Sequence, residues 1–270
     1  QVMPGVTSIR TPRNLQRTFR NVCVLTHVPP VDPDGNDVDF PYVVRYEAEA
    51  KVLSTERKTL LLVCVGSNGG RYFQMVQSAD LGRECFAQQL FELVNTLLGR
   101  RALTKHLHVR TYAVVPLGEE SGMVEWIPNT QNLLEAVVSC QRGAGPHTTE
   151  QPVGCVDSFF TRPLTEQQAE AASKPRECQS RPADSTPVLH VVLERGFGQD
   201  QRRLYDAQTN FVNSNAVNFV VQNVLGVCDR HMKDVLLDTT LGEVVHVHFD
   251  GWVSGKTSPQ HNGIVPFRLT

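Results

Sequence analysis

The feature that most constrains the fold is a change of hydrophobic period within the first hundred residues. KTLLLVCVG (58–66) and RYFQMVQ (71–77) are short apolar stretches separated by SNGG, which is a pattern typical of a β-hairpin. From residue 79 the period becomes helical up to Gly99, a residue that suits a helix end. The apolar residues at helical spacing are Leu81, Cys85, Leu90, Leu93, Val94, Leu97 and Leu98.

Other stretches of the first half also have strand character. They are YVVRYEAEAKVLS (42–54), LHVRTYAVVPL (107–117) and GMVEWIP (122–128), and residues 28–41 are a Pro- and Asp-rich loop. The first half therefore predicts a small antiparallel sheet with one helix.

The second half begins with different material. Residues 141–187 are rich in Pro, Gly, Ser and charge, which predicts a flexible insert with a short helix at TEQQAEAA. Residues 213–225 predict a buried helix with Ser or Asn near its N-cap. VLLD (235–238) and VVHVHFD (244–250) predict a hairpin-like pair.

Composition excludes several classes of protein. The net charge of −2 and the pI of about 6.5 give no global field that would attract nucleic acid or an acidic membrane. No apolar run approaches the roughly 20 residues that span a bilayer, and the N-terminus lacks the apolar core of a signal peptide. The seven scattered cysteines contain no CxxC pair, which favours a reducing compartment. The missing initiator Met and the abrupt end indicate a piece of a longer chain.

Several motifs then occur in a characteristic order. GSNG, DLGRE, LVNTLL, RTYAVVPL followed by SGMVEWIPNT, then DRH, VHVHFD and IVPFRLT together resemble the catalytic domain of the phosphatidylinositol-3-kinase-related protein kinases. Within that family the wording is most similar to the ATR-type DNA-damage checkpoint kinases. The resemblance runs from about residue 45 to residue 270, apart from the insert.

The resemblance implies a two-lobed α+β fold of the protein-kinase-like, PI3/PI4-kinase type, with a C-lobe that is cut short. Residues 1–40 would be an N-terminal extension and loop, 41–125 the N-lobe, and 126–270 the hinge and partial C-lobe with the insert at 141–187. The reaction implied is transfer of the ATP γ-phosphate to protein Ser or Thr, with ATP and Mg²⁺.

The catalytic loop is intact in its two principal residues. By resemblance, Asp229 accepts the proton of the substrate hydroxyl and His231 stabilises the transferring phosphoryl group. Cys228 replaces a glycine of the family pattern, and this adds a side chain where the backbone needs freedom.

The metal-binding positions depart from the family. Asp234 stands where the family has an Asn ligand and still offers hard oxygen, whereas His248 stands where the family has its principal metal Asp. A neutral imidazole is a poor ligand for Mg²⁺. On a strand, Asp250 would share a face with His248, but it would lie about 6–7 Å further along, too far to replace it.

The phosphate-binding positions of the N-lobe depart as well. Alignment with the family puts Val76 at the phosphate-binding lysine, Ala79 at one orienting acid and Glu84 at the other. An apolar Val76 cannot neutralise phosphate charge. Lys51, from the segment that covers the phosphates in the family, could substitute, although a solvated surface lysine is the favoured interpretation.

The hinge matches the family at EWI (125–127). Trp126 would cover the adenine and the backbone at Ile127 would hydrogen-bond to it, while the alternative for Trp126 is a core residue at a sheet edge.

These replacements predict an impaired kinase or a pseudokinase, in which binding of ATP and Mg²⁺ is weakened. One alternative is an active kinase that uses Asp234 and Lys51. Another is a scaffold that docks partners, or a zinc module formed by Cys228, His231, His246 and His248, although packing roles are the commoner fate of such residues. By resemblance we expect protein substrates, a partner subunit and a nuclear location, with no direct sign of nucleic acid or membrane binding.

Overall fold

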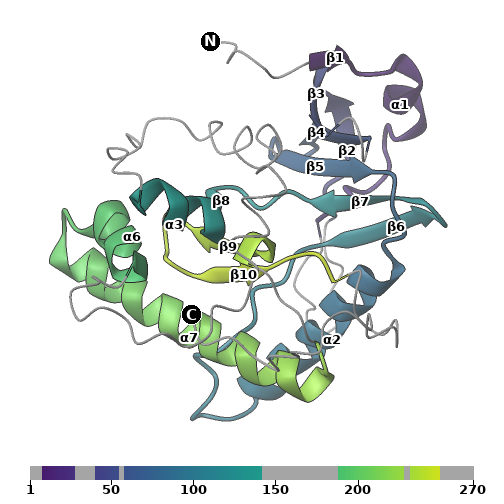
Figure 1. Ribbon diagram of the computed structural model, residues 1–270. Helices are drawn as coiled ribbons and strands as arrows, with labels where there is room; N and C mark the ends of the chain where they lie inside the picture. The colour runs from purple at the N-terminus through teal and green to yellow at the C-terminus, as the bar shows by residue number, and fades with distance from the viewer. Residues whose placement is uncertain (1–7, 28–39, 55–57, 142–187, 228–231, 250–270) are drawn as a thin grey trace, which may run out of the picture. The chain divides into compact units, whose positions relative to one another are not determined.

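The computed structural model describes residues 8–27, 40–54, 58–141, 188–227 and 232–249. Helices and strands are mixed along the chain, as expected for an α+β fold (Figure 1). The chain forms two compact units, the first from Gln1–Glu92 and Thr111–Pro128, the second from Leu93–Arg110 and Asn129–Thr270. The predicted lobe boundaries at residues 40 and 125 stay predictions.

The first unit contains one antiparallel sheet. Its strands are β1 (Ser8–Arg10), β2 (Val43–Tyr46), β3 (Glu49–Ser54), β4 (Thr59–Gly66), β5 (Arg71–Gln77), β6 (Val114–Gly118) and β7 (Ser121–Glu125). The order is β1-β3-β4-β5-β7-β6, and β2 also pairs with β4. The predicted hairpin is the pair β4–β5, in register from Leu60 opposite Val76 to Val65 opposite Arg71.

Two details of this sheet differ from expectation. Residues 42–54 form two strands, and β1 and helix α1 (Arg13–Thr18) arise within the predicted extension. Between β2 and β3, the carbonyl groups of Glu47 and Ala48 bind Thr11. The backbone N–H of Thr11 donates to the carbonyl of Ala48 at 2.9 Å, and its hydroxyl donates to the carbonyl of Glu47 at 2.7 Å. Residues 8–27 are therefore joined to the sheet.

Helix α2 (Gly82–Gly99) follows β5, as the helical period predicts. The carboxylate of Asp80 accepts a hydrogen bond from the backbone N–H of Gly82 at 2.9 Å, and the first helical bond runs from Cys85 to the carbonyl of Leu81 at 2.9 Å. The strand expected over 107–117 is shorter, because only β6 from Val114 pairs with β7.

The second unit has a three-stranded sheet and helices packed against it. The sheet has the order β10-β9-β8, and its strands are β8 (Thr130–Asn132), β9 (Val235–Asp238) and β10 (Val244–His246). The helices are α3 (Leu133–Gln141), α6 (Val188–Phe197), α7 (Gln201–Leu225) and the short 3₁₀ helix η1 (Met232–Asp234). The expected pairing of β9 with β10 is confirmed.

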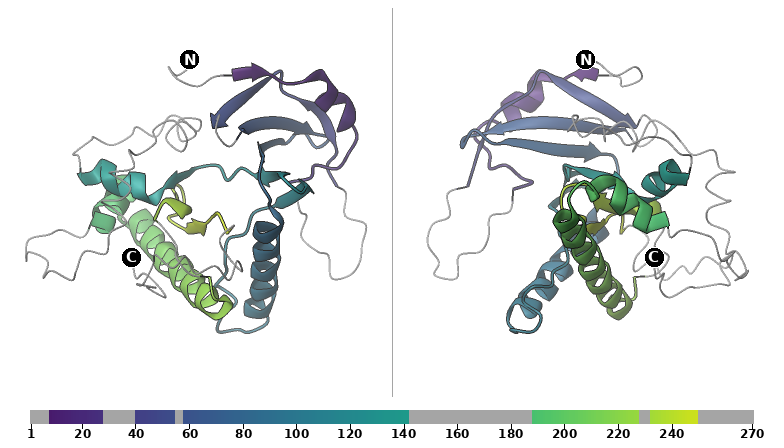
Figure 2. Two further views of the ribbon diagram at one scale, coloured as in Figure 1. Left: turned by 45° about the vertical axis from the view of Figure 1, so that its right-hand side comes forward. Right: turned by 90° about the vertical axis from the view of Figure 1, so that its left-hand side faces the viewer.

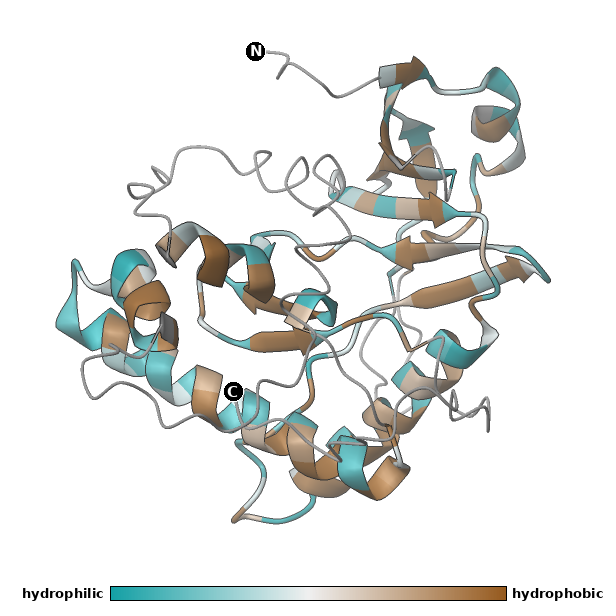
Figure 3. Cartoon of the chain, in the orientation of Figure 1, coloured by the Kyte–Doolittle hydropathy of each residue, from teal (hydrophilic) through white to brown (hydrophobic). Residues whose placement is uncertain are grey.

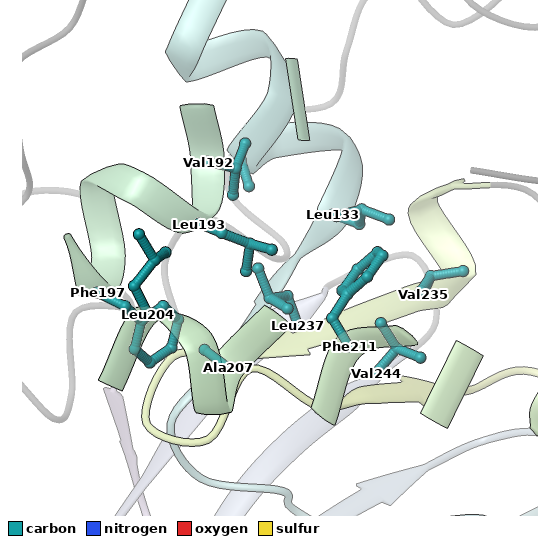
Figure 4. Close-up of a cluster of buried hydrophobic side chains, with 11 residues drawn as sticks. Leu133, Val192, Leu193, Phe197, Leu204, Ala207, Phe211, Val235, Leu237 and Val244 are labelled. Atoms are coloured by element: carbon teal, nitrogen blue, oxygen red, sulfur yellow. The ribbon is translucent and has the colours of Figure 1, made fainter. Parts of the chain in front are cut away.

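The core of this unit joins helices to the hairpin. Figure 4 shows side chains from α3, α6 and α7 meeting those of β9 and β10. Leu133 and Val244 are fully buried, and Phe211 from α7 is 7% exposed. Burial of apolar surface of this kind is the main force that holds the hairpin on the helices.

Helix α7 is much longer than the sequence predicts. It begins at Gln201, where the N-cap Asp200 accepts a hydrogen bond from the N–H of Arg202 at 2.9 Å, and ends at Gly226 with φ of 69°. Both views of Figure 2 show it as one continuous helix, and Figure 3 shows polar and apolar residues along its whole length. The sequence predicts a Ser or Asn cap near residue 213, but Ser214 is buried in the middle of the helix and its hydroxyl donates back to the carbonyl of Asn210 at 2.6 Å.

No helix in the described part of the chain is long and apolar enough to cross a membrane. The expected loop at 28–41 is described only from residue 40, and the insert with its short helix at TEQQAEAA lies outside the described residues.

Candidate active site

The two predicted metal positions are brought together by the backbone of the second unit. The N–H of Val247 donates to the carbonyl of Asp234 at 2.9 Å. This bond joins η1, which ends at Asp234, to the segment that follows β10 and carries His248. The Asn132 side chain fixes the same turn by donating to the carbonyl of Lys233 at 2.5 Å.

His248 does not lie on a strand. Strand β10 ends at His246, and His248 has φ of 63°, in the left-handed region that His, Asn and Asp visit more readily than bulky residues. The expectation that His246 and His248 share a strand face is therefore wrong, since alternation stops before His248. Asp250 lies outside the described residues, so the expectation that it is too far along to replace His248 stays a prediction.

The donors at these positions fit magnesium poorly. Asp234 is half-buried and offers a carboxylate, but the neighbouring position offers only the half-buried imidazole of His248. Mg²⁺ requires oxygen ligands in near-octahedral geometry, whereas imidazole suits zinc or copper. Among the described residues, no group of three or more His, Cys, Asp or Glu side chains could hold a metal ion.

The predicted catalytic loop comes between α7 and η1 in the sequence. Cys228, Asp229 and His231 lie outside the described residues. The loop follows directly from α7, because Val227 donates to the carbonyl of Gln222 at 2.8 Å after the helix ends at Gly226. The zinc alternative depended on two of these residues and stays a prediction.

A partly buried ion pair anchors the hairpin that carries these positions. Asp238, at the end of β9, is 2% exposed and pairs with the guanidinium of Arg110. Burial alone would raise the pKa of Asp238, but hydrogen bonds from Arg110, Thr240 and Leu241 outweigh it and hold the pKa below its ordinary value of 3.8. Glu243 adds a second carboxylate 3.7 Å from Arg110. Asp238 is therefore charged and fixes both ends of the β9–β10 turn.

Sequence reasoning missed this anchor, although a signal was present. Arg110 begins the motif RTYAVVPL, and Asp238 ends an apolar strand just before a turn. A lone arginine and a lone aspartate at the ends of buried segments are candidates for pairing, because a buried charge without a partner is very costly.

In the first unit, Val76 packs in an apolar environment. It lies against a cluster formed by Val24, Val43, Tyr46, Ala50, Leu62 and Cys64, which we call the β4 cluster. Its direct neighbours across the sheet are Leu60 on β4 and Met123 on β7. Its assignment to the lysine position of the family stays a prediction.

Lys51 lies on the other face of the same sheet. It is opposite Leu61, which is in turn opposite Met75, and directly opposed residues share a face. Lys51 is half-buried, so it is neither a core residue nor a fully solvated one.

Glu84 is buried in the first turn of α2 and binds a neighbouring segment. Its carboxylate accepts a hydrogen bond from the hydroxyl of Tyr112 at 2.6 Å, and one turn later the side chain of Gln88 accepts from the backbone N–H of Tyr112 at 3.2 Å. Glu92 accepts from the Thr111 hydroxyl. These hydrogen bonds hold residues 111–112 against α2. This explains why the expected strand begins only at Val114. Ala79 is half-buried just before the helix.

The predicted hinge continues from β7. The N–H of Trp126 donates to the carbonyl of Phe73 at 2.9 Å, which extends the β5–β7 pairing by one residue. Trp126 is half-buried and Ile127 is 8% exposed. Trp126 is thus neither a fully buried core residue nor a surface residue.

Comparisons with known proteins agree with this arrangement. The family model "Phosphatidylinositol 3- and 4-kinase" matches residues 72–270. Serine/threonine-protein kinase tel1 of Schizosaccharomyces pombe is 32% identical over 89% of this chain and 8% of its own length. Serine/threonine-protein kinase ATR of Oryza sativa subsp. indica is 27% identical over 94% of this chain and 9% of its own length. Serine-protein kinase ATM of Sus scrofa is 28% identical over 94% and 8% respectively.

A solved structure shows the same fold. The "FAT and kinase domain of CtTel1" aligns with 99% of this chain and 19% of its own chain, with a TM-score of 0.71 and 24% sequence identity. At that identity the likeness concerns the fold alone.

The comparisons settle the family and leave the branch open. Tel1, ATR and ATM kinases match at similar identities, so the ATR branch stays a prediction. The chain spans less than a tenth of the length of these curated relatives. Since the family model covers well over half of the chain, and the order of motifs and the fold agree with it, this protein belongs to the phosphatidylinositol 3- and 4-kinase family, as a kinase domain of the PI3K-related protein kinases.

Proposed function

We propose that this chain is a Ser/Thr protein kinase domain of ATR type whose phosphoryl transfer is impaired or lost. The observation that supports the proposal most directly is the hydrogen bond from the N–H of Val247 to the carbonyl of Asp234, because it joins the segment that carries His248 to the segment that carries the Asp234 carboxylate. Kinases of this family use ATP and Mg²⁺, and a metal-bound aspartate is one of the parts that kinases need.

The chemistry follows from what the chain's own residues can do. Asp229 would accept the proton of a substrate hydroxyl and His231 would donate toward the transferring phosphoryl group. Asp234 would supply hard oxygen. With His248 at the second position, the donor set does not fit magnesium.

The test is to restore the missing ligand. The chain is assayed with ATP, Mg²⁺ or Mn²⁺ and a Ser-Gln peptide, as purified and as the variants His248→Asp, His248→Asn and Asp229→Ala. We expect transfer by the unaltered chain to equal that of Asp229→Ala. His248→Asp should raise it at least about tenfold, which corresponds to about 1.4 kcal/mol.

His248→Asn is the matched control, because it also adopts left-handed backbone readily but brings no negative charge. Robust transfer by the unaltered chain that is lost in Asp229→Ala would contradict the proposal and favour an active kinase.

An active kinase with compensating residues is the second candidate. One observation favours it: Lys51 is half-buried on the face of the sheet that Leu61 and Met75 share, so its long side chain is partly fixed. In that case Lys51→Met should abolish transfer, while Lys58→Met, at an exposed lysine of the β3–β4 connection, should leave it unchanged.

The cellular setting is also part of the proposal. By its resemblance to the ATR-type kinases, we place it in checkpoint signalling in the nucleus, within a longer chain that has protein substrates and a partner subunit. The names of the relatives support the first step of this, a kinase that acts on serine or threonine of proteins. Thermal shift with ATP in EDTA separates a nucleotide-binding domain from a docking module: a rise in Tm means that nucleotide is held, and no rise favours a scaffold.

A further inference from the structure

The N-terminal part of the first unit carries charge of one sign only. Residues 8–27 contain Arg10, Arg13, Arg17 and Arg20 and no Asp or Glu, although the whole chain has a net charge of −2. In the described part of the chain, none of the four arginines forms an ion pair. Positive charge is therefore concentrated on β1 and α1, and it is not balanced there by carboxylates.

Helix α1 is fixed to the sheet by its apolar side. Leu15 and Phe19, the residue that caps the helix at its C-terminal end, pack against the β4 cluster. The ring of Phe19 also meets the ring of Tyr46 edge-on, with the centroids 6.4 Å apart. The backbone of α1 is thus held in place, and its polar residues are presented from a fixed support.

Three exposed arginines belong to this support. Arg13 and Arg17 are one turn apart on α1, and Arg20 follows directly after the cap. We call them the α1 arginines. Like charges at this spacing destabilise a helix, and the first turn of α1 holds no acidic residue that would relieve the repulsion. A guanidinium presents a planar fork of donors that matches a carboxylate, so these residues suit an acidic partner.

Strand β1 leaves an open edge next to α1. It is the last strand on one side of the seven-stranded sheet (Figure 1), and among the described residues no strand pairs with its outer side. The N–H of Thr11 donates to the carbonyl of Ala48, toward β3. Because backbone groups alternate along an antiparallel strand, those of Arg10 and Ser8 point away from β3, to the open edge.

The open edge selects the class of partner. An extended peptide can add to a free strand edge by main-chain hydrogen bonds, whereas nucleic acid and lipid headgroups are held by charge and have no strand to add. A second copy of the chain would bring another positive segment to the same edge, and like charges across a strand pair are unfavourable. An extended peptide that carries carboxylates satisfies both the edge and the α1 arginines.

We infer that β1 and α1 form a docking surface for an acidic segment of a partner protein, which adds as a strand to β1 and pairs its carboxylates with the α1 arginines. Arg10 contributes less to the charge, because it lies opposite Glu49 across the β1–β3 pair. The inference does not depend on phosphoryl transfer, and it fails or holds separately from the proposed function.

The first experiment separates strand addition from simple charge attraction. Fluorescence anisotropy measures binding of a labelled peptide of about twelve alternating Glu and Thr residues to the whole chain at physiological salt, where exposed charges more than about 8 Å apart are largely screened. The control peptide alternates Glu with Pro, which keeps the charge but lacks the N–H groups that a strand requires. We expect saturable binding of the Glu–Thr peptide and at least about tenfold weaker binding of the Glu–Pro peptide, a difference of about 1.4 kcal/mol.

The second experiment tests the α1 arginines. Arg13→Gln combined with Arg17→Gln should weaken binding of the Glu–Thr peptide at least about tenfold and leave Tm unchanged, because Gln has nearly the helix propensity of Arg. Arg100→Gln combined with Arg101→Gln is the matched control. It removes the same charge from two exposed residues of the second unit and should leave peptide affinity unchanged.

The third experiment tests the edge itself. Ser8→Pro removes an N–H that points to the open side, at the first residue of an edge strand, where proline is tolerated. It should weaken the Glu–Thr peptide and keep Tm. Ile9→Pro removes an N–H that points to β3 and should lower Tm. If Ser8→Pro binds the Glu–Thr peptide as well as the unaltered chain does, strand addition to β1 is excluded.

Other occupants have their own outcomes, and each overturns the inference. One is absence of saturable peptide binding. Another is binding of single-stranded DNA or of phosphatidylserine vesicles that is as tight as that of the Glu–Thr peptide. The last is peptide binding that appears only after Asp32, Asp34, Asp37 and Asp39 are all changed to Asn. That result would assign the surface to the chain's own acidic segment, which lies outside the described residues.

Discussion

At the scale of single residues, the ionised carboxylate of Asp238 stabilises the β9–β10 turn. It is almost fully buried, and its carboxylate receives hydrogen bonds from Arg110, from both groups of Thr240 and from the N–H of Leu241. All of these donors favour the ionised form. A buried aspartate with such partners holds a turn in one conformation.

Asp238→Asn should destabilise the protein by about 2–3 kcal/mol, because an amide cannot balance the guanidinium of Arg110. Glu243 remains 3.7 Å from Arg110 and limits the loss. Urea denaturation at pH 7 measures the effect. Glu47→Gln is the control: it breaks an exposed pair with Arg71 and should cost less than about 1 kcal/mol.

The same substitution has a pH signature. The pKa of Asp238 is lowered in the folded state, so its contribution to stability is complete above the ordinary pKa of 3.8 and is lost as the pH falls through the folded value. The difference in unfolding free energy between the unaltered chain and Asp238→Asn should therefore be constant near neutral pH and shrink below about pH 4. A difference that grows in acid would contradict this account.

At the scale of elements, the β9–β10 turn is shaped by its contact with α7. Gly242 has φ of 78°, and a Cβ at this position would lie 2.7 Å from the Cβ of Ala207 on α7. The side chain of Asn210 also donates to the carbonyl of Leu241 at 2.8 Å, and the N–H of Val244 donates to the hydroxyl of Ser214 at 3.0 Å. Asn210 and Ser214, two polar residues in the middle of α7, therefore hydrogen-bond to the β9–β10 hairpin and hold it against the helix.

Gly242→Ala should cost about 3 kcal/mol or more, because left-handed backbone strain of about 1–2 kcal/mol adds to a clash with Ala207. Gly69 is a matched control, since its φ of 77° is nearly the same but a Cβ added there would meet nothing within 4 Å. Gly69→Ala should show only the strain. Equal losses of unfolding free energy in the two variants would exclude the contact with α7 as a cause.

At the scale of the whole molecule, stability is divided between two units with separate cores. In the second unit, the cluster of Figure 4 holds three helices and the hairpin together. The proposed site depends on it, because Asp234 and His248 flank the hairpin that this core supports.

Phe211→Ala should lower the unfolding free energy by about 3–5 kcal/mol, the usual cost of removing a large aromatic side chain from a core. Val212→Ala is the control, since Val212 is the next residue on the same helix and is 62% exposed. It should change stability by less than about 0.5 kcal/mol. Circular dichroism in urea measures the unfolding free energy of both variants. If Val212→Ala lost as much unfolding free energy as Phe211→Ala, this would contradict the assignment of Phe211, and not Val212, to the core.

Local patterns in the chain are enough to specify several of its elements. The β4–β5 hairpin, α2 and the pairing of β9 with β10 follow from hydrophobic period and turn residues, which act over a few residues. The family also follows from the sequence, because the motif order survives in the chain. The prediction that His248 stands in place of a carboxylate also comes from the sequence alone.

Features that depend on distant partners emerge only in the folded chain. The late start of β6 and the pairing of Arg110 with Asp238 both arise from contacts between segments far apart in the sequence. The faces of Val76 and Lys51 belong here too, because a shift of one residue in a strand exchanges its two sides and the local pattern tolerates either register. His248 leaves the strand for the same kind of reason: the bond from Val247 to Asp234 ends the alternation that its neighbours suggest.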